Sequence, residues 1–319
     1  MSISINSNEY EIINNIKENN ISKIYKVFNK KNNKYYSLKQ ISIKDLNEEE
    51  IEYIQNESNI LSTINNEHIV KYYDSSKEND NFYILTEYVE GQNLIEFIKK
   101  YKNQKHIDDD ILYKIIFDLC SAIKEIHNKN IIHRGLKPEN IMIVKDSIKI
   151  CGFGNSKKIN AYGNISIGTI NYMAPEMIQN EKYNNKVDIW ALGCIIYELL
   201  TLNICFQGDN LFGIVNKIIN EKHGKIDLKY YDKKWQNLID LLLQKEHKKR
   251  PDINGVFQYL KKIEPTKIIT KKLSFEEFNK NKKKKNFQNI ESKNNYIIFF
   301  NLVLLLGDVD TGKTSLIGT

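Results

Sequence analysis

The sequence His-Arg-Gly-Leu-Lys-Pro-Glu-Asn at residues 133–140, followed by Gly-Phe-Gly at residues 152–154, decides the fold of this 319-residue chain. Three of its positions are glycines, and two of these, Gly135 and Gly152, bear on the chemistry of the site. Glycine has no side-chain atom that could accept a proton or ligate a cation. A site built from the polar residues around these glycines therefore lacks a functional group at both positions, and no change of rotamer can supply one.

The stretch resembles the catalytic loop and the metal-binding turn of protein kinases, H-R-D-L-x-x-x-N and D-F-G. In that family the first aspartate accepts the proton of the substrate hydroxyl, and the second binds magnesium. Gly135 stands at the first position and Gly152 at the second. By the same resemblance, Lys137 would contact the γ-phosphate and Asn140 would hold a second metal ion.

Other kinase motifs occur in the family's order between residues 36 and 251. Tyr-Ser-Leu-Lys at residues 36–39 resembles the V-A-I-K segment, which makes Lys39 the candidate for gripping the nucleotide phosphates. Glu57 lies in a stretch with helical apolar spacing and would pair with Lys39. The remaining motifs are Gly-Thr-Ile-Asn-Tyr-Met-Ala-Pro-Glu at residues 168–176, Asp-Ile-Trp-Ala-Leu-Gly at residues 188–193 and Arg-Pro at residues 250–251.

This resemblance implies an α+β fold with two lobes. We expect a kinase-like domain over residues 1–265, with a small β-rich lobe at about residues 9–89 and a large, mainly helical lobe at about residues 90–265. Hydrophobic periodicity agrees with this order of strands and helices. It predicts strands within residues 12–46 and 82–88, and helices at residues 48–64, 111–127, 188–202 and 235–243.

The resemblance also suggests which residues would line a nucleotide slot. These candidates are Ile16, Ile24, Ser37, Thr86, Glu87, Val89 and Met142. The family's phosphate-covering loop, G-x-G-x-x-G-x-V, aligns so that Lys17, Asn19 and Ser22 replace its three glycines. Side chains at these positions crowd or redirect the loop. We therefore expect weak binding of ATP at most, and poor binding of Mg²⁺ because Gly152 supplies no carboxylate.

Two functions are compatible with these motifs. The first is a pseudokinase of Ser/Thr type with weak or no phosphotransfer, acting as a signalling scaffold or an allosteric regulator. The alternative is a weakly active, ATP-dependent Ser/Thr protein kinase in which Lys137, Asn140 and a neighbouring acid reorganise around a metal ion. Both imply a protein partner or substrate. The sequence leaves open which protein this is, the kinase subgroup and the oligomeric state.

The net charge of +7 does not indicate a nucleic-acid partner, because the basic residues are concentrated in one segment. Residues 1–265 hold 37 basic and 35 acidic residues, whereas residues 266–295 hold nine lysines and three glutamates. We interpret residues 266–295 as a Lys/Asn-rich linker. Within it, Lys280–Lys285 could instead serve nuclear import or contact an acidic membrane.

The first ten residues are polar and lack the apolar segment of a signal peptide, so we expect a cytoplasmic protein, with nuclear entry through Lys280–Lys285 as the alternative. The four cysteines are scattered without the spacing of a zinc site or a disulfide framework. They are expected to be small, buried apolar residues.

A second phosphate-binding motif lies at the C-terminus, in residues 296–319. Apolar residues 302–306 lead into Gly-Asp-Val-Asp-Thr-Gly-Lys-Thr at residues 307–314, which matches the P-loop pattern through Gly307, Gly312, Lys313 and Thr314. The segment resembles the opening of a small GTPase, and the sequence stops before the other motifs of such a domain. A truncated fusion to a GTPase-like domain is the favoured explanation; a vestigial tail and a short docking segment are the alternatives. We expect no transmembrane helix, because the apolar run of residues 296–306 is shorter than the roughly 20 residues needed.

Overall fold

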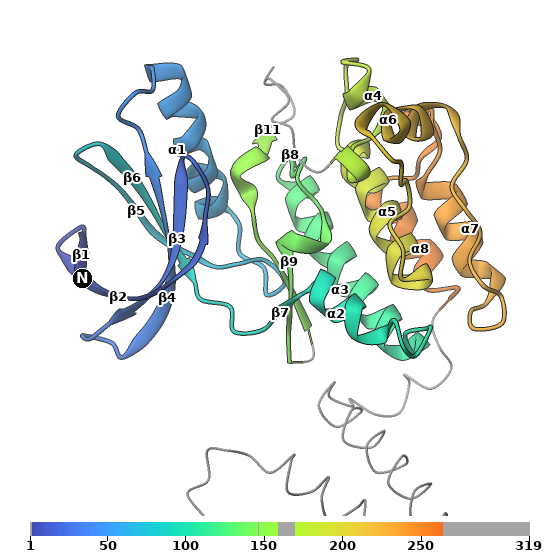
Figure 1. Cartoon of the computed structure of the whole chain (residues 1–319), viewed down its shortest axis with the longest axis horizontal. Coiled ribbons are helices and arrows are strands. Elements are labelled where there is room, and N and C mark those ends of the chain that lie inside the picture. The colour runs from blue at the N-terminus through green and yellow to red at the C-terminus, as the bar shows by residue number, and fades with distance from the viewer. Residues whose placement is uncertain (1, 146, 159–169, 264–319) are drawn as a thin grey trace, which may run out of the picture. The chain divides into compact units, whose positions relative to one another are not determined.

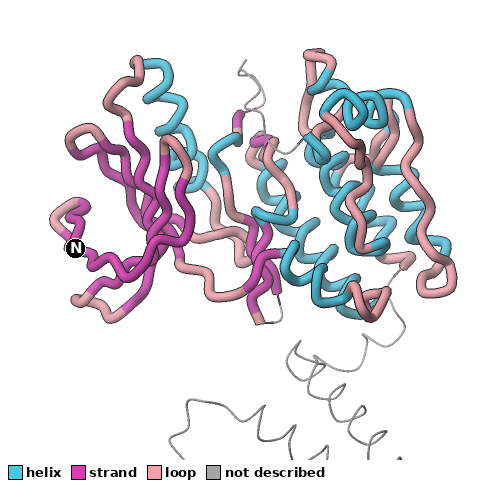
Figure 2. Tube along the Cα trace, viewed as in Figure 1, coloured by secondary structure: helices cyan, strands magenta, loops and turns pink. Residues whose placement is uncertain are grey.

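The structure is a computed structural model that describes residues 2–145, 147–158 and 170–263. These residues form a β-sheet lobe followed along the chain by a mainly helical lobe (Figures 1 and 2). The expected two-lobed α+β fold is confirmed. Several sequence predictions lie outside the described residues: the linker at residues 266–295 with its basic run Lys280–Lys285, the first two residues of the motif at 168–176, and the C-terminal P-loop with Gly307, Gly312, Lys313 and Thr314.

The small lobe is built on a six-stranded antiparallel sheet with the order β1-β2-β3-β4-β6-β5. Its strands are β1 (Ser2–Ile5), β2 (Asn8–Glu18), β3 (Ser22–Asn29), β4 (Lys34–Ser42), β5 (Tyr72–Glu78) and β6 (Asn81–Glu87). Alternate residues of a strand face the same side of the sheet, and here they bury Tyr36 and Leu38 of β4 in one cluster with Val27 and Leu85. This packing fixes the face on which Ser37 and Lys39 lie.

Strand β1 is not predicted by the sequence pattern. Asn6 and Ser7 both have positive φ, 46° and 65°, and connect β1 to β2 as a two-residue hairpin turn. Ile5 is fully buried and packs in the same cluster as Tyr10. The signal is weak because the strand has only four residues, with two isoleucines among polar neighbours.

Helix α1 (Glu48–Thr63) lies beside the sheet and agrees with the helix predicted at residues 48–64 (Figure 1). It begins at a capping box, in which the Asn47 side chain accepts from the Glu50 amide and the Glu50 carboxylate accepts from the Asn47 amide. Its apolar residues Ile51 and Ile54 pack against a sheet cluster that contains Phe82. This anchoring points the next turn of α1, which carries Glu57, toward β4.

The large lobe is held together by helices around a buried central helix, α5. The helices are α2 (Leu94–Tyr101), α3 (Asp109–Asn128), α4 (Pro175–Ile178), α5 (Lys186–Thr201), α6 (Leu211–Asn220), α7 (Lys233–Leu242) and α8 (Ile253–Leu260). Helix α5 is apolar on all sides, as expected of a helix inside a core. Trp190 of α5 and Trp235 of α7 are both fully buried. Among the described residues, no helix is long and apolar enough to cross a membrane.

Several short strands and 3₁₀ turns follow the six-stranded sheet along the chain, and some of them carry the motifs that opened the sequence analysis. These are β7 (Gln92–Asn93), β8 (Ile131–Ile132), β9 (Ile141–Val144), β10 (Ser147–Ile150) and β11 (Lys157–Lys158), with 3₁₀ turns η1 (Pro138–Asn140), η2 (Phe153–Asn155), η3 (Ile170–Tyr172) and η4 (His247–Lys249). Strand β9 pairs with β10, so the loop before β9 and the turn after β10 lie at the same end of this pair. Gly135 and Gly152 belong to these two segments.

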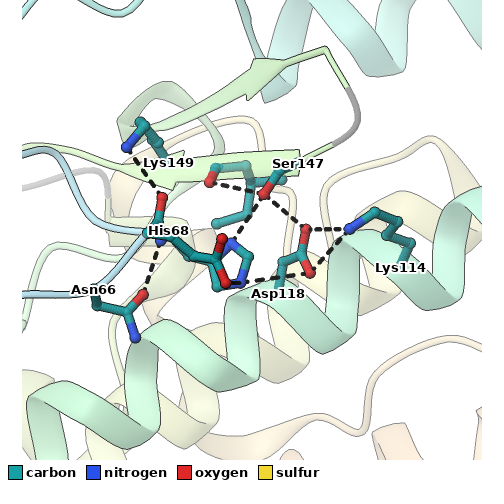
Figure 3. A network of polar contacts seen from close by, with 8 residues as sticks. Asn66, His68, Lys114, Asp118, Ser147 and Lys149 are labelled. Carbon is teal, nitrogen blue, oxygen red and sulfur yellow. Dashed lines mark hydrogen bonds and ion pairs between the residues drawn. The ribbon is translucent and has the colours of Figure 1, made fainter. Parts of the chain in front are cut away.

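A polar network joins the connection between α1 and β5 to the large lobe (Figure 3). His68 Nδ1 lies 2.9 Å from the Ser147 hydroxyl, which donates to Asp118 of α3 at 3.0 Å. Lys114 forms an ion pair with the same carboxylate at 3.0 Å. Asp118 is 3% exposed, so its hydrogen bonds offset the cost of burying a charge. The network attaches the end of α1 to α3 and β10, and so limits the positions that Glu57 can take.

Candidate nucleotide and phosphotransfer site

The lysine and glutamate predicted from the sequence lie in contact. Lys39 of β4 and Glu57 of α1 form an ion pair of 2.5 Å between Nζ and Oε2. The Glu57 side chain is only 9% exposed. A Cβ added to Gly154 would lie 3.3 Å from Glu57 Oε2 and 3.4 Å from Lys39 Nζ, so the Gly-Phe-Gly turn passes directly against the pair. The arrangement that would grip nucleotide phosphates in a kinase is therefore assembled in this chain.

The loop that contains Gly135 is held in place by the buried carboxylate of Asp188. Asp188, at the start of α5, accepts hydrogen bonds from the backbone amides of His133 and Arg134 and from His127 Nε2, each at 2.9 Å. Burial by itself raises the pKa of Asp188, but the hydrogen bond and charge of His127, together with His133, hold that pKa below its usual value. The carboxylate therefore stays ionised and fixes the backbone just before Gly135.

Gly135 stands beside free space. A Cβ added there would meet no atom closer than 3.6 Å, and its nearest neighbours would be Asn155 Nδ2 and the His133 ring. A cavity of about 40 Å³ borders Gly135, Arg134 and Lys137. The backbone could therefore accept a Cβ at this position. The group that a kinase uses as a base is absent here, but the space beside Gly135 remains open.

The space at Gly152 is filled instead. Gly152 has a φ of +77°, and an added Cβ would lie 2.6–2.8 Å from the three carboxamide atoms of Asn140. The Asn140 Nδ2 donates to the Gly135 carbonyl oxygen at 2.8 Å. The carboxamide predicted to hold a second metal ion thus covers one glycine and is hydrogen-bonded to the other. This position of Asn140 was not predicted, and no feature of the sequence indicates it.

The residues around Gly152 do not fit a magnesium ion. Mg²⁺ requires oxygen ligands in near-octahedral geometry, usually including one or two carboxylates. Gly152 offers none, and the carboxylate of Glu57 is engaged by Lys39. Within the described ranges, no group of three or more His, Cys, Asp or Glu side chains is arranged to hold a metal.

The turn that would cover phosphates, between β2 and β3, is closed on itself. The Asn19 side-chain oxygen accepts from the amides of Ile21 and Ser22, at 3.1 and 2.7 Å, and from the Ser22 hydroxyl at 3.1 Å. Backbone amides in this turn are the groups that a glycine-rich loop directs at phosphate. Asparagine commonly bonds backbone amides two or three residues ahead, so Asn19 near Ser22 was a signal for this turn.

The slot residues predicted from the sequence come from both lobes. Ser37 of β4 is the register partner of Thr86 of β6, and Ile24 of β3 is the partner of Lys39. Ile16 is 49% exposed on β2. The other candidates are Val89, after β6, and Met142 on β9 in the large lobe, both partly buried.

Two further predicted residues are Glu87, at the end of β6, and Lys137, at the start of η1. The Glu87 carboxylate pairs with Lys149 at 2.9 Å and accepts from the Lys71 amide at 3.2 Å, so it faces β10 rather than standing free. Lys137 caps the N-terminal end of η1 in an extended conformation, two residues after Gly135.

Two further contacts hold segments of the fold together around this site. The rings of His133 and Phe153 pack edge to face at 4.6 Å, joining the two glycine-bearing segments. The Tyr172 hydroxyl donates to Glu198 at 2.6 Å inside the large lobe. Burial, followed by the charge and hydrogen bond of Glu198, raises the pKa of Tyr172 far above its usual value, so the phenol remains a donor.

Comparison with known proteins agrees with this geometry. The protein kinase domain matches residues 10–262. Similar proteins include the probable serine/threonine-protein kinase nek2 of Dictyostelium discoideum, 31% identical over 260 residues, which cover 79% of this chain and 62% of that protein. Serine/threonine-protein kinase Nek1 of Mus musculus is 32% identical over 278 residues, which cover 85% of this chain and 23% of that protein. The probable serine/threonine-protein kinase nek3 of Dictyostelium discoideum is 34% identical over 259 residues, which cover 78% of this chain and 23% of that protein.

The chain therefore spans between 23% and 62% of the length of these relatives. The shared region coincides with the two lobes described above. From the match over residues 10–262 and the two-lobed fold, the chain belongs to the protein kinase family, through a serine/threonine-kinase-like domain.

Proposed function

We propose that this domain is a pseudokinase, which uses a kinase-like fold for signalling as a scaffold or an allosteric regulator. The observation that carries the proposal is the state of the two glycine sites. Gly135 supplies no base, and at Gly152 the missing carboxylate is replaced by the carboxamide of Asn140, bonded to Gly135. The closed turn at Asn19 supports it, because the amides that would face phosphate are already engaged.

The size of the expected losses favours this proposal over an active enzyme. A general base contributes about 10²–10⁴-fold, and metal ions contribute several kcal/mol of charge stabilisation. Losing both would lower a typical kinase rate of roughly 1–100 per second by about five orders of magnitude. Lys39, Glu57 and the loop held by Asp188 would then maintain the folded structure without supporting phosphotransfer.

A weakly active kinase remains the second candidate, because the Lys39–Glu57 ion pair is formed and Lys137 stands at its family position. Glu139, whose Oε2 is buried and has no hydrogen-bond partner among the described residues, is the nearest acid along the loop. In this alternative Glu139 would take over part of the role of the missing aspartates.

Phosphotransfer from ATP to a general protein substrate such as casein decides between the two candidates. The wild-type chain is expected to transfer phosphate at least about 10⁴-fold more slowly than a typical kinase, with no dependence on Lys39. Lys39→Met is compared with Lys34→Met, a matched substitution of an exposed lysine on the same strand. Transfer at family-like rates that Lys39→Met abolishes and Lys34→Met preserves would overturn the pseudokinase proposal.

Nucleotide binding is tested separately by a thermal-shift titration with ATP, with and without Mg²⁺. A ligand at five times its Kd stabilises the folded state by about 1 kcal/mol, which corresponds to a rise of about 2–4 °C for a domain of this size. We expect a shift of this order at millimolar ATP that Mg²⁺ leaves nearly unchanged, since the site lacks a carboxylate for the metal. Lys39→Met should remove the shift and Lys34→Met should keep it. A shift that becomes several-fold larger with Mg²⁺ would contradict the expected loss of the metal site.

A further inference from the structure

A groove on the large lobe lies outside the nucleotide site. It is formed by the segment after α6, residues 222–228, and by α7 with the residues that follow it, and has a volume of about 560 Å³. Figure 1 shows α7 at the edge of this lobe. Four lysines line the groove: Lys222, Lys225, Lys233 and Lys245.

The groove keeps most of its positive charge. Asp240, the carboxylate among the lining residues, lies 3.2 Å from His223 Nε2 and accepts from Gln236 Nε2 at 2.8 Å. The other ring nitrogen of His223 lies 2.8 Å from the Gly224 carbonyl oxygen. Asp240 is thus held by its neighbours. In the described part of the chain, Lys222, Lys225 and Lys233 form no ion pair with a carboxylate.

Lys245 fixes one side of the groove. Its Nζ donates to the carbonyl oxygen of Ile218 at 2.5 Å and to that of Lys217 at 3.3 Å. Burial lowers the pKa of Lys245 to about 8. Its Nζ also lies 5.1 Å from the ring centroid of Trp190 and 4.8 Å from that of Phe206, so this cation is directed at the core and anchors the wall of the groove.

The groove also has an apolar part. Leu228 is 58% exposed at its rim, while Ile226 and Leu243 are each 5% exposed beneath it. An isolated exposed leucine needs no explanation, but one beside unpaired lysines provides a surface for an apolar side chain flanked by acids. Lysines around a single apolar rim match a short peptide better than an extended nucleic acid.

We propose that this groove docks a short acidic peptide segment of a partner protein, with its carboxylates toward Lys222, Lys225 and Lys233 and an apolar side chain on Leu228. Charge complementarity favours a partner over the chain's own tail, because residues 266–295 hold nine lysines against three glutamates. The proposal does not depend on whether the domain transfers phosphate, since the groove contains no residue of the nucleotide site.

The test is binding of a fluorescein-labelled peptide, about eight residues long with glutamates on both sides of one leucine, measured by anisotropy at 150 mM salt with the full chain. Lys225→Glu plus Lys233→Glu reverses two groove charges, and Lys233 opens α7, where an acidic residue is favourable. The matched control is Lys31→Glu plus Lys34→Glu on exposed positions of the β3–β4 turn, which changes the net charge equally. Thermal unfolding of both variants checks that they remain folded.

We expect the groove variant to raise the peptide Kd at least about tenfold, or 1.4 kcal/mol, and the control variant to change it less than about twofold. Replacing the peptide's leucine by serine should also weaken binding to the wild-type chain. Equal losses in both variants, or none in either, would overturn the proposal, because binding would then reflect net charge or the lysine-rich segment. It would also fail if only a phosphoserine version of the peptide bound, or if a single-stranded oligonucleotide competed equally well.

Discussion

Replacing Arg250 with alanine is expected to lower the free energy of unfolding by about 3–5 kcal/mol, the usual cost of removing one partner of a buried ion pair. Arg250 is 1% exposed and binds the carboxylate of Glu176 through two parallel hydrogen bonds of 2.6 and 2.8 Å. Its loss leaves Glu176, which is 3% exposed, as an uncompensated buried charge. Urea unfolding followed by fluorescence of the buried tryptophans measures the change.

Arg250 also holds together segments that are distant along the chain. It donates to the carbonyl oxygens of Gln244, Lys186 and Lys245, and its guanidinium lies 4.9 Å from the ring centroid of Trp190. These contacts join α5 to the segments before α8 and after α7. The side chain therefore contributes packing and backbone hydrogen bonds in addition to its charge.

Two further variants separate these contributions. Lys249→Ala removes the neighbouring ion pair with Glu246, whose side chains are 60% and 68% exposed, and should cost less than about 1 kcal/mol. Adding Glu176→Gln to Arg250→Ala should recover part of the loss by removing the buried charge, but not the part due to the lost backbone hydrogen bonds. A cost of Arg250→Ala no larger than that of Lys249→Ala would contradict the structural role assigned to this arginine.

Most of the fold could be predicted from the sequence because motifs and periodicity agreed. The helix at residues 48–64 was predicted from its apolar spacing, and the structure shows it with a capping box at Asn47 and Glu50. Motifs at residues 133–140 and 188–193 placed the loop and the central helix. Strand β1 was missed because its four residues carry little periodic signal, and its place depends on pairing with β2.

The site could be predicted only in part, because side-chain positions depend on local geometry. Lys39 and Glu57 lie 18 positions apart, and family spacing was enough to predict that they meet. The position of Asn140 could not be predicted in this way. Its carboxamide occupies the space where a side chain at position 152 would begin. This position depends on the hydrogen bond to the Gly135 carbonyl oxygen, which only the structure shows.

The two glycine positions therefore differ in the space around them, and the sequence alone does not show this difference. A Cβ could be added at Gly135 without displacing any atom, whereas at Gly152 it would displace Asn140. The position of the kinase base is an open site here. At the position of the metal ligand, the Asn140 carboxamide fills the space and is held by its bond to the Gly135 carbonyl oxygen within its own loop. The two positions are therefore structurally coupled through Asn140, because a side chain at position 152 would displace the carboxamide that is hydrogen-bonded to Gly135.

From this coupling we expect that Gly135→Asp plus Gly152→Asp raises the rate of ATP-dependent phosphotransfer by at least about 10²-fold, the lower range for restoring a general base. Gly135→Asp alone should gain little, since no metal site is restored. Gly152→Asp alone should lower stability by about 1–3 kcal/mol, because it displaces Asn140 and places an aspartate at positive φ. In the double variant the displaced Asn140 oxygen and the carboxylate introduced at position 152 could together serve as ligands for Mg²⁺.

The measurement is the rate of phosphate transfer to casein for the wild-type chain, both single variants and the double variant, at saturating ATP with and without Mg²⁺. Adding Lys39→Met to the double variant should abolish the gain, and adding Lys34→Met should preserve it. A gain that needs both substitutions, Mg²⁺ and Lys39 would show that the scaffold still positions the phosphates. If the double variant gained Mg²⁺-dependent ATP binding but no activity, the turn closed by Asn19 would be the remaining obstacle. An added Asn19→Gly substitution should then release the amides of Ile21 and Ser22 and raise the rate.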